Sequence, residues 1–204
     1  TACAVADALG TGPDALVFDV SNACLGVLNG MVELANRIEL GQIRAGLVVS
    51  AESSREIVES SIARMNADPT LELYRLGLAT LTGGSGAAAV VLTEAGFSDS
   101  EHRLVAGAAQ SAPEHHRICR WGPARGLLGE TVNLMDTDAS KVLTHGVALG
   151  RRTWDTFLAA TGWRTEEGDR VIAHQVGAGH RGEVLASLGV DEARDFSTFA
   201  TLGN

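Results

Sequence analysis

The hydrophobic positions along the chain predict strands and helices in alternation. Residues 15–20 are apolar apart from Asp19, a pattern typical of a strand covered on both faces. From Leu25 onward, apolar residues recur near helical spacing, and residues 45–51 then form a second apolar run. A strand, a crossover helix and a second parallel strand make a βαβ unit, so the pattern predicts an α/β fold.

The rest of the chain continues this alternation. Between the strands, we expect a polar insert at residues 52–74, serving either as a lid or binding element or as a solvated surface excursion. Residues 113–136 show no clear period and predict a long ordered loop. The other predicted helices lie at residues 1–9, 53–65, 72–81, 137–160 and 179–188, and the other predicted strands at 87–92, 103–109, 169–173 and, as a strand or loop, 195–199.

A glycine-rich run, Gly-Gly-Ser-Gly, occupies residues 83–86. It precedes a predicted strand instead of opening a helix, and no Lys-Ser/Thr pair follows it. A phosphate-binding loop requires both features, so this function is rejected. We expect these glycines to allow close approach of neighbouring backbone.

Composition and charge argue against several classes of binding partner. The 204 residues are 45% hydrophobic and carry a net charge of −9, which argues against nucleic acid or an anionic membrane surface as the main partner. No apolar run approaches the roughly 20 residues that span a bilayer, so no integral membrane segment is predicted. The three cysteines, Cys3, Cys24 and Cys119, lack metal-ligand spacing and fit reduced thiols in the cytosol.

Cys24 lies between the first predicted strand and the helix that follows it. Ser21 and Asn22 are residue types that cap helices, which places Cys24 at or just before the first helical turn. There the free backbone N–H groups and the helix dipole lower the pKa of a thiol, as covalent acyl transfer requires. The alternative is a small buried hydrophobic residue, and the local sequence leaves both open.

Two further polar residues follow predicted secondary structure in the second half. His174 comes directly after the apolar residues 171–173, and ligands of open α/β sheets bind beyond the carboxyl ends of strands. Taken alone, His174 is more often a hydrogen-bonded structural histidine, and Asn204 after Gly203 would ordinarily be a turn residue. Nothing in the sequence assigns a role to the remaining histidines considered, His102, His115, His116 and His145.

Together these motifs resemble a known signature. Residues 21–26 (Ser-Asn-Ala-Cys-Leu-Gly), 173–175 (Ala-His-Gln) and 202–204 (Leu-Gly-Asn) are similar, in this order, to the Cys-His-Asn signature of the thiolase superfamily in its β-ketoacyl synthase III branch. Within it, the chain looks most like the OleA-type acyl-CoA condensing enzymes of long-chain olefin biosynthesis. Gly177 stands where fatty-acid initiation enzymes usually carry Asn. Further similar positions are Arg64, Met65, Ile118, Cys119, Arg120 and His180.

The resemblance implies two related α/β halves in an αβαβα arrangement, truncated here at both ends. Residues 1–96 would belong to the N-terminal half with the cysteine, and residues 97–204 to the C-terminal half with the histidine and asparagine. It also implies a cytoplasmic homodimer, and a glutamate base supplied by a preceding segment. We therefore expect the 204-residue piece alone to be poorly stable and inactive, because core faces would be exposed.

The roles that the resemblance implies fall on Cys24, His174 and Asn204. Cys24 would hold an acyl group, while His174 and Asn204 would stabilise the enolate of a second thioester; no cofactor or metal takes part. The expected reaction is a non-decarboxylative Claisen condensation of two fatty acyl-CoA molecules. The alternatives are decarboxylative condensation with a malonyl thioester, with an acyl carrier protein as partner, or a non-catalytic partner subunit. Glu52 is a polar residue for which a structural role is preferred.

Overall fold

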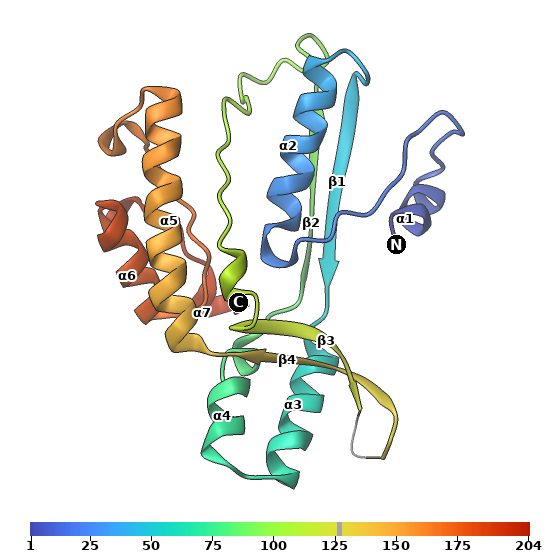
Figure 1. The fold of residues 1–204 in the computed structure, drawn as a ribbon. Helices are drawn as coiled ribbons and strands as arrows, with labels where there is room; N and C mark the ends of the chain where they lie inside the picture. The colour runs from blue at the N-terminus through green and yellow to red at the C-terminus, as the bar shows by residue number, and fades with distance from the viewer. Residues whose placement is uncertain (126–127) are drawn as a thin grey trace. The chain divides into compact units, whose positions relative to one another are not determined.

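The structure is a computed structural model that describes residues 1–125 and 128–204. By its internal contacts, the described chain forms two compact units. The first unit comprises residues 1–52 and 86–105, and the second comprises residues 53–85 and 106–204. Figure 1 labels the helices and strands of both units.

The first unit is built on a two-stranded sheet with one helix against it. Strand β1 (Ala45–Glu52) pairs with β2 (Gly86–Thr93). Helix α2 (Gly26–Glu39) runs along this pair (Figure 1). Glycine makes the approach possible, because a Cβ on Gly46 would lie 2.6 Å from the Leu34 side chain. The predicted helix after Cys24 and the predicted strand 45–51 are thus confirmed.

The pairing and covering of β1 differ from the prediction. β1 pairs antiparallel with β2, and residues 15–20, the first strand of the expected βαβ unit, form no strand, so the described residues do not form that unit. Gly46 and Val48 face α2, and the pleat therefore turns Leu47 and Val49 to the opposite face. These two side chains are 43% and 41% exposed, and Val91, the register partner of Leu47, is 67% exposed. Within the described chain, one face of the sheet is covered and the other is an open apolar surface.

Two predicted strands, one in this unit and one that crosses into the second unit, are wrong. Residues 15–20 and 103–109 form no strand in the structure. Apolar β-rich sequence favours extended backbone, but a strand also needs a neighbour to complete its hydrogen-bond ladder. Among the described residues, neither segment has such a neighbour. The predicted N-terminal helix is confirmed as α1 (Ala2–Leu9), and it ends at Gly10 with φ of 68°.

The second unit contains a β-hairpin with two helices against it. Strands β3 (Cys119–Arg125) and β4 (Thr131–Thr137) pair antiparallel where a loop was predicted. Pro123 hid the strand pattern, yet a two-stranded sheet tolerates proline because each strand has an outer edge. Helices α3 (Arg55–Ala67) and α4 (Leu71–Gly77) contact β4.

The predicted polar insert thus supplies α3 and the start of α4, the two helices that contact β4. Ile57 on α3 is only 7% exposed. Beyond the insert, Thr80 in the short helix η2 (Thr80–Thr82) is fully buried and donates a hydrogen bond to the Met135 carbonyl at 3.2 Å. Most other residues of the insert are exposed, so both alternatives for its role, a lid or binding element and a solvated surface excursion, stay predictions.

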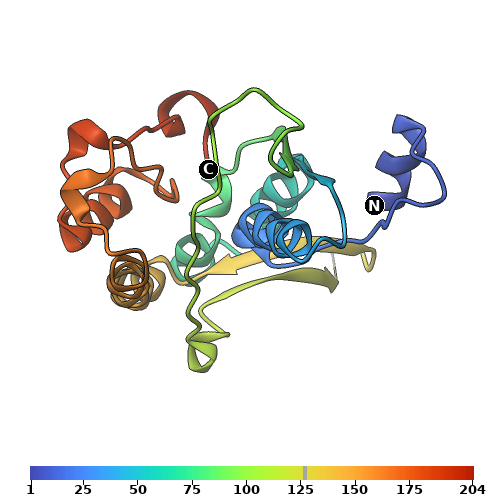
Figure 2. The ribbon, with the colours of Figure 1, turned by 90° about the horizontal axis from the view of Figure 1, so that it is seen from above.

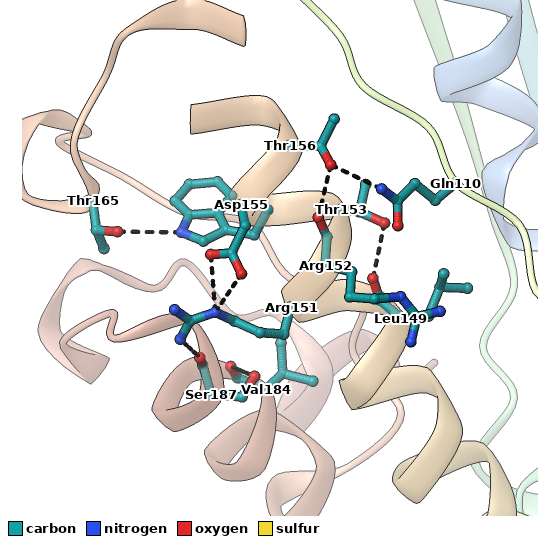
Figure 3. Close-up of polar contacts among 11 residues, drawn as sticks. Gln110, Leu149, Arg151, Arg152, Thr153, Asp155, Thr156, Thr165, Val184 and Ser187 are labelled. Carbon is teal, nitrogen blue, oxygen red and sulfur yellow. Dashed lines mark hydrogen bonds and ion pairs between the residues drawn. The ribbon is translucent and has the colours of Figure 1, made fainter. Parts of the chain in front are cut away.

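Two long helices lie side by side in the same unit. Helix α5 (Ala139–Thr161) contacts α6 (Ala178–Leu188), as Figures 1 and 2 show. Arg151 on α5 donates to both carboxylate oxygens of Asp155 at 3.0 and 3.1 Å, and to the Ser187 carbonyl of α6 at 2.7 Å (Figure 3). Both predicted helices are confirmed.

The remaining elements of the second unit are short. The predicted strands 169–173 and 195–199 are reduced to one parallel bridge between Val171 and Asp195. The last helix, α7 (Phe199–Leu202), is a single turn. Short 3-10 helices occur in both units at η1 (Ala23–Leu25), η3 (Pro113–His115), η4 (Thr165–Glu167) and η5 (Glu192–Arg194).

Candidate functional site

Cys24 occupies the tight turn that leads into α2. The turn is η1 (Ala23–Leu25), closed by a hydrogen bond from the Leu25 N–H to the Asn22 carbonyl at 3.0 Å, and α2 starts at Gly26. Cys24 is exposed, so the alternative of a small buried hydrophobic residue is wrong. The expected position just before the first turn of the helix is confirmed.

The backbone just before Cys24 has an unusual conformation. Ala23 has φ of +43°, the one positive φ of a non-glycine residue in the described chain. Left-handed backbone is unfavourable for an L-residue, and such strain tends to occur at functional sites. Asn22 makes no cap to the helix backbone; its side-chain amide instead donates to the Asn29 side chain at 2.5 Å. The helix cap expected of Asn22 is therefore not formed, and the strained turn was not predicted from the sequence.

His174 lies three residues after Val171, which forms the short bridge with Asp195 in the second unit. Around that bridge, the Val171 N–H donates to the Arg194 carbonyl at 3.0 Å, and the Phe196 N–H donates to the Val171 carbonyl at 2.9 Å. Partial desolvation by the surrounding protein lowers the pKa of His174, and the positive charge that His180 can carry lowers it further. His174 therefore favours the neutral imidazole, which donates one hydrogen bond.

An ion pair fixes α6 next to this bridge. Arg181 on α6 donates from Nε to Asp195, whose side chain is only 2% exposed. The pKa of Arg181 is raised by this hydrogen bond, so the guanidinium stays charged. His180, the preceding residue, has a buried Nε2 without a hydrogen-bond partner among the described residues.

Asn204 is held by the glycine-rich run. Its backbone N–H donates to the Thr82 carbonyl at 2.9 Å, and its carbonyl accepts from the Gly84 N–H at 2.8 Å. A Cβ on Gly84 would lie 2.2 Å from the Leu202 carbonyl oxygen, so only glycine fits. Close backbone approach is thereby confirmed for Gly84. It does not apply to Gly86, whose Cβ would meet nothing within 4 Å.

Gln175 is part of the Ala-His-Gln motif at residues 173–175, but sequence reasoning assigned no role to it. Its Oε1 accepts hydrogen bonds from the backbone N–H groups of Thr198 and Phe199, both at 2.7 Å. The position directly after His174 was the one available signal. His174 and Asn204 thus belong to two connected segments of the second unit, while Cys24 belongs to the first unit.

The described residues give no support for a metal site or a membrane span. No cluster of three or more His, Cys, Asp or Glu side chains in residues 1–125 and 128–204 could hold a metal ion. Over the same residues, no helix is long and apolar enough to cross a bilayer.

Comparison with known proteins extends these observations. No protein-family model matches the chain. Over 209 aligned residues it is 48% identical to the acyl-CoA:acyl-CoA alkyltransferase of Shewanella oneidensis, covering 100% of this chain and 59% of that protein. All of this chain also superposes on 57% of a crystallised Cys-to-Ala variant of Xanthomonas campestris OleA, with 34% identity and a TM-score of 0.90.

The resemblance to OleA-type enzymes is confirmed. The fold is accordingly thiolase-like α/β, and the chain spans less than two thirds of the relatives that it matches. A Cys-to-Ser variant of Xanthomonas campestris OleA, crystallised with lauric acid and lauroyl-CoA, covers 99% of this chain. That match has 34% identity and a TM-score of 0.86, and this chain spans 58% of that protein.

Proposed function

We propose that the whole enzyme condenses two fatty acyl-CoA molecules to a β-ketoacyl-CoA without decarboxylation. The observation that carries this proposal is the 48% identity, over the whole chain, to an acyl-CoA:acyl-CoA alkyltransferase. Lauroyl-CoA bound to the related OleA supports a fatty acyl-CoA as the substrate class. Cys24, His174 and Asn204 are the residues that we assign to the chemistry.

In the first half-reaction, Cys24 accepts an acyl group. Its exposed thiol lies directly before α2, where the first backbone N–H groups of a helix lack intrahelical acceptors. The thiolate attacks the thioester carbonyl of one acyl-CoA, the new C–S bond forms, and coenzyme A leaves as a thiolate that takes up a proton. The product is an acyl-Cys24 thioester.

In the second half-reaction, His174 and Asn204 stabilise an enolate. A base removes the Cα proton of the second acyl-CoA, and these two side chains donate hydrogen bonds to its thioester oxygen. The lowered pKa of His174 supports this role, because a neutral imidazole is the form that the proposal requires. The enolate carbon attacks the acyl-Cys24 carbonyl, a C–C bond forms, and the Cys24 thiolate is released. Two acyl-CoA molecules thus yield one β-ketoacyl-CoA and one coenzyme A.

The base is not assigned to any residue of this chain. The resemblance predicts a glutamate from a preceding segment, together with a cytoplasmic homodimer. The two family halves at residues 1–96 and 97–204 likewise stay predictions. A dimer would be supported by a molecular mass of two subunits in light scattering of the full-length protein.

The test uses the full-length enzyme with lauroyl-CoA and no malonyl donor. Intact-protein and peptide mass spectrometry would detect the acyl adduct, and solvent extraction would detect the β-keto product. We expect both, with the adduct lost in Cys24→Ala and kept in the matched control Cys3→Ala, which removes another exposed thiol. Product only after addition of a malonyl thioester would establish the decarboxylative alternative. A folded protein without any Cys24 adduct would leave the partner-subunit alternative.

A further inference from the structure

The side chain of Gln175 accepts a set of hydrogen bonds from three consecutive residues. Besides the two backbone N–H groups at 2.7 Å, the hydroxyls of Ser197 and Thr198 lie 3.1 and 3.4 Å from the same Oε1 atom. A carbonyl oxygen has two lone pairs, so the two short N–H bonds are the main interactions. Gln175 therefore binds chiefly the backbone at the start of α7.

These hydrogen bonds supply the N-terminal cap that α7 lacks by itself. The helix is only four residues long, and so short a helix is not stable on its own. Its first N–H groups have no intrahelical acceptors, and Thr198, the N-cap residue, provides no side-chain cap in the structure. Gln175, which lies 24 residues before Phe199 in the chain, takes the place of that cap.

The same bonds connect the two segments to which the enolate-stabilising roles are assigned. Gln175 directly follows His174, and α7 leads through Gly203 to Asn204. At its far end, Asn204 is fixed by hydrogen bonds with Thr82 and Gly84. The Asn204 segment is thus held at two points, and one of them is the side chain next to His174.

We propose that Gln175 is a positioning residue that sets the spacing between His174 and Asn204 for the condensation step. The inference rests on the proposed function, because that function assigns both side chains to one thioester oxygen. Gln175 has no role in the acylation of Cys24. Loss of its acceptor oxygen slows C–C bond formation and leaves acyl transfer to Cys24 unchanged.

The kinetic test compares Gln175→Met with Gln175→Glu in the full-length enzyme. Methionine keeps the length of the side chain and removes the amide oxygen, whereas glutamate keeps an acceptor oxygen for the two N–H groups. We expect Gln175→Met to lower the rate of β-keto product formation about tenfold to a hundredfold, because catalysis is sensitive to small misplacements. The rate at which the Cys24 adduct appears stays at the wild-type value, and Gln175→Glu recovers most of the condensation rate.

A second readout is independent of activity. Hydrogen–deuterium exchange of peptides covering residues 196–204 reports the protection of the Thr198 and Phe199 amides. Exchange becomes faster in Gln175→Met and stays near the wild-type rate in Gln175→Glu. Ser197→Ala is the matched control, since it removes one hydroxyl donor and leaves both backbone bonds. If Gln175→Met does not fold, the shorter amide of Gln175→Asn takes its place.

Three results would overturn the inference. The first is hydrogen–deuterium exchange of residues 196–204 that is unchanged in Gln175→Met. The second is an equal loss of the acylation rate and the condensation rate in that variant. The third is a condensation rate that falls as much in Gln175→Glu as in Gln175→Met. A wild-type enzyme that forms no β-keto product contradicts the proposed function instead. In that case the exchange comparison still decides whether Gln175 holds the Asn204 segment.

Discussion

The turn that carries Cys24 and the segments that carry His174 and Asn204 are held in different ways. The turn is formed by contacts within a few residues, such as the Leu25 to Asn22 hydrogen bond at 3.0 Å. Asn204, by contrast, is bonded to Thr82 and Gly84, more than a hundred residues earlier in the chain.

This difference predicts different responses to substitution. A local turn depends on the backbone preference of its own residues, so changes at Ala23 should act on Cys24 alone. A segment held by distant contacts depends on every surface that it meets, so changes far away in the chain should act on Asn204. The two half-reactions of the proposed mechanism can therefore be disturbed separately.

The largest effect is expected at Gly84. Gly84→Ala would place a Cβ 2.2 Å from the Leu202 carbonyl oxygen, and backbone cannot yield as a flexible side chain can. Overpacking of this kind costs about 1–3 kcal/mol of folding free energy. Displacement of Asn204 should also lower the condensation rate about a hundredfold, while Cys24 is still acylated. Thermal unfolding and half-reaction rates of the full-length enzyme measure both effects.

Gly86→Ala is the matched control for that substitution. It adds the same methyl group two residues away, where nothing lies within 4 Å. Its unfolding temperature and condensation rate should equal those of the wild type. Equal losses in both variants would show that glycine is needed along the whole run and not for contact with the Asn204 segment.

The same distinction between local and distant contacts explains what the sequence could predict. The helix after Cys24, the place of Cys24 just before that helix and the ends of α1 and α5 at Gly10 and Gly162 all depend on neighbouring residues. Local pattern and glycine backbone preference are sufficient to predict such features. The glycine-rich run predicted that backbone would approach Gly84 closely, but it did not predict that the approaching segment would be the one around Leu202.

Features that depend on distant pairing were not predictable from the local pattern. The antiparallel pairing of β1 with β2 joins segments about forty residues apart, and the apolar run at residues 45–51, which predicts a parallel strand, does not identify its partner. The β3–β4 hairpin was missed because proline, here Pro123, is unfavourable inside a strand. It is tolerated in this case because β3 pairs on one side only and its other edge is open. Gln175 was missed because its acceptor role depends on where α7 lies.

A smaller effect is expected at Ala23. The positive φ of 43° costs an L-residue about 1–2 kcal/mol, and a β-branched side chain tolerates it even less well than alanine. Ala23→Val should therefore slow acylation of Cys24 and lower the unfolding temperature. Ala23→Gly should keep the acylation rate, with stability changed by less than about 1 kcal/mol. Stopped-flow release of coenzyme A measures the acylation step. The idea fails if valine and glycine at this position have the same effect.

The smallest expected effect is a shift in pH dependence at His174. Desolvation and the charge of His180 lower the pKa of His174 below its ordinary 6.5, so the neutral donor persists to a lower pH than in the unfolded chain. Since the folded state binds this proton less readily than the unfolded state, the contribution of His174 to stability is complete above pH 6.5 and is lost as the pH falls below it. The acid limb of the condensation rate should accordingly lie below pH 6.5.

His180→Asn sharpens this expectation, because it removes the neighbouring charge and leaves the desolvation. The pKa of His174 should then rise towards 6.5, and the acid limb of condensation should move to higher pH in the same direction. Cys24 lies in a turn that is held by local contacts and is independent of the His174 segment. The acylation of Cys24 should therefore keep its wild-type pH profile. Parallel movement of both profiles would contradict that independence and would indicate one titrating group shared by the two half-reactions.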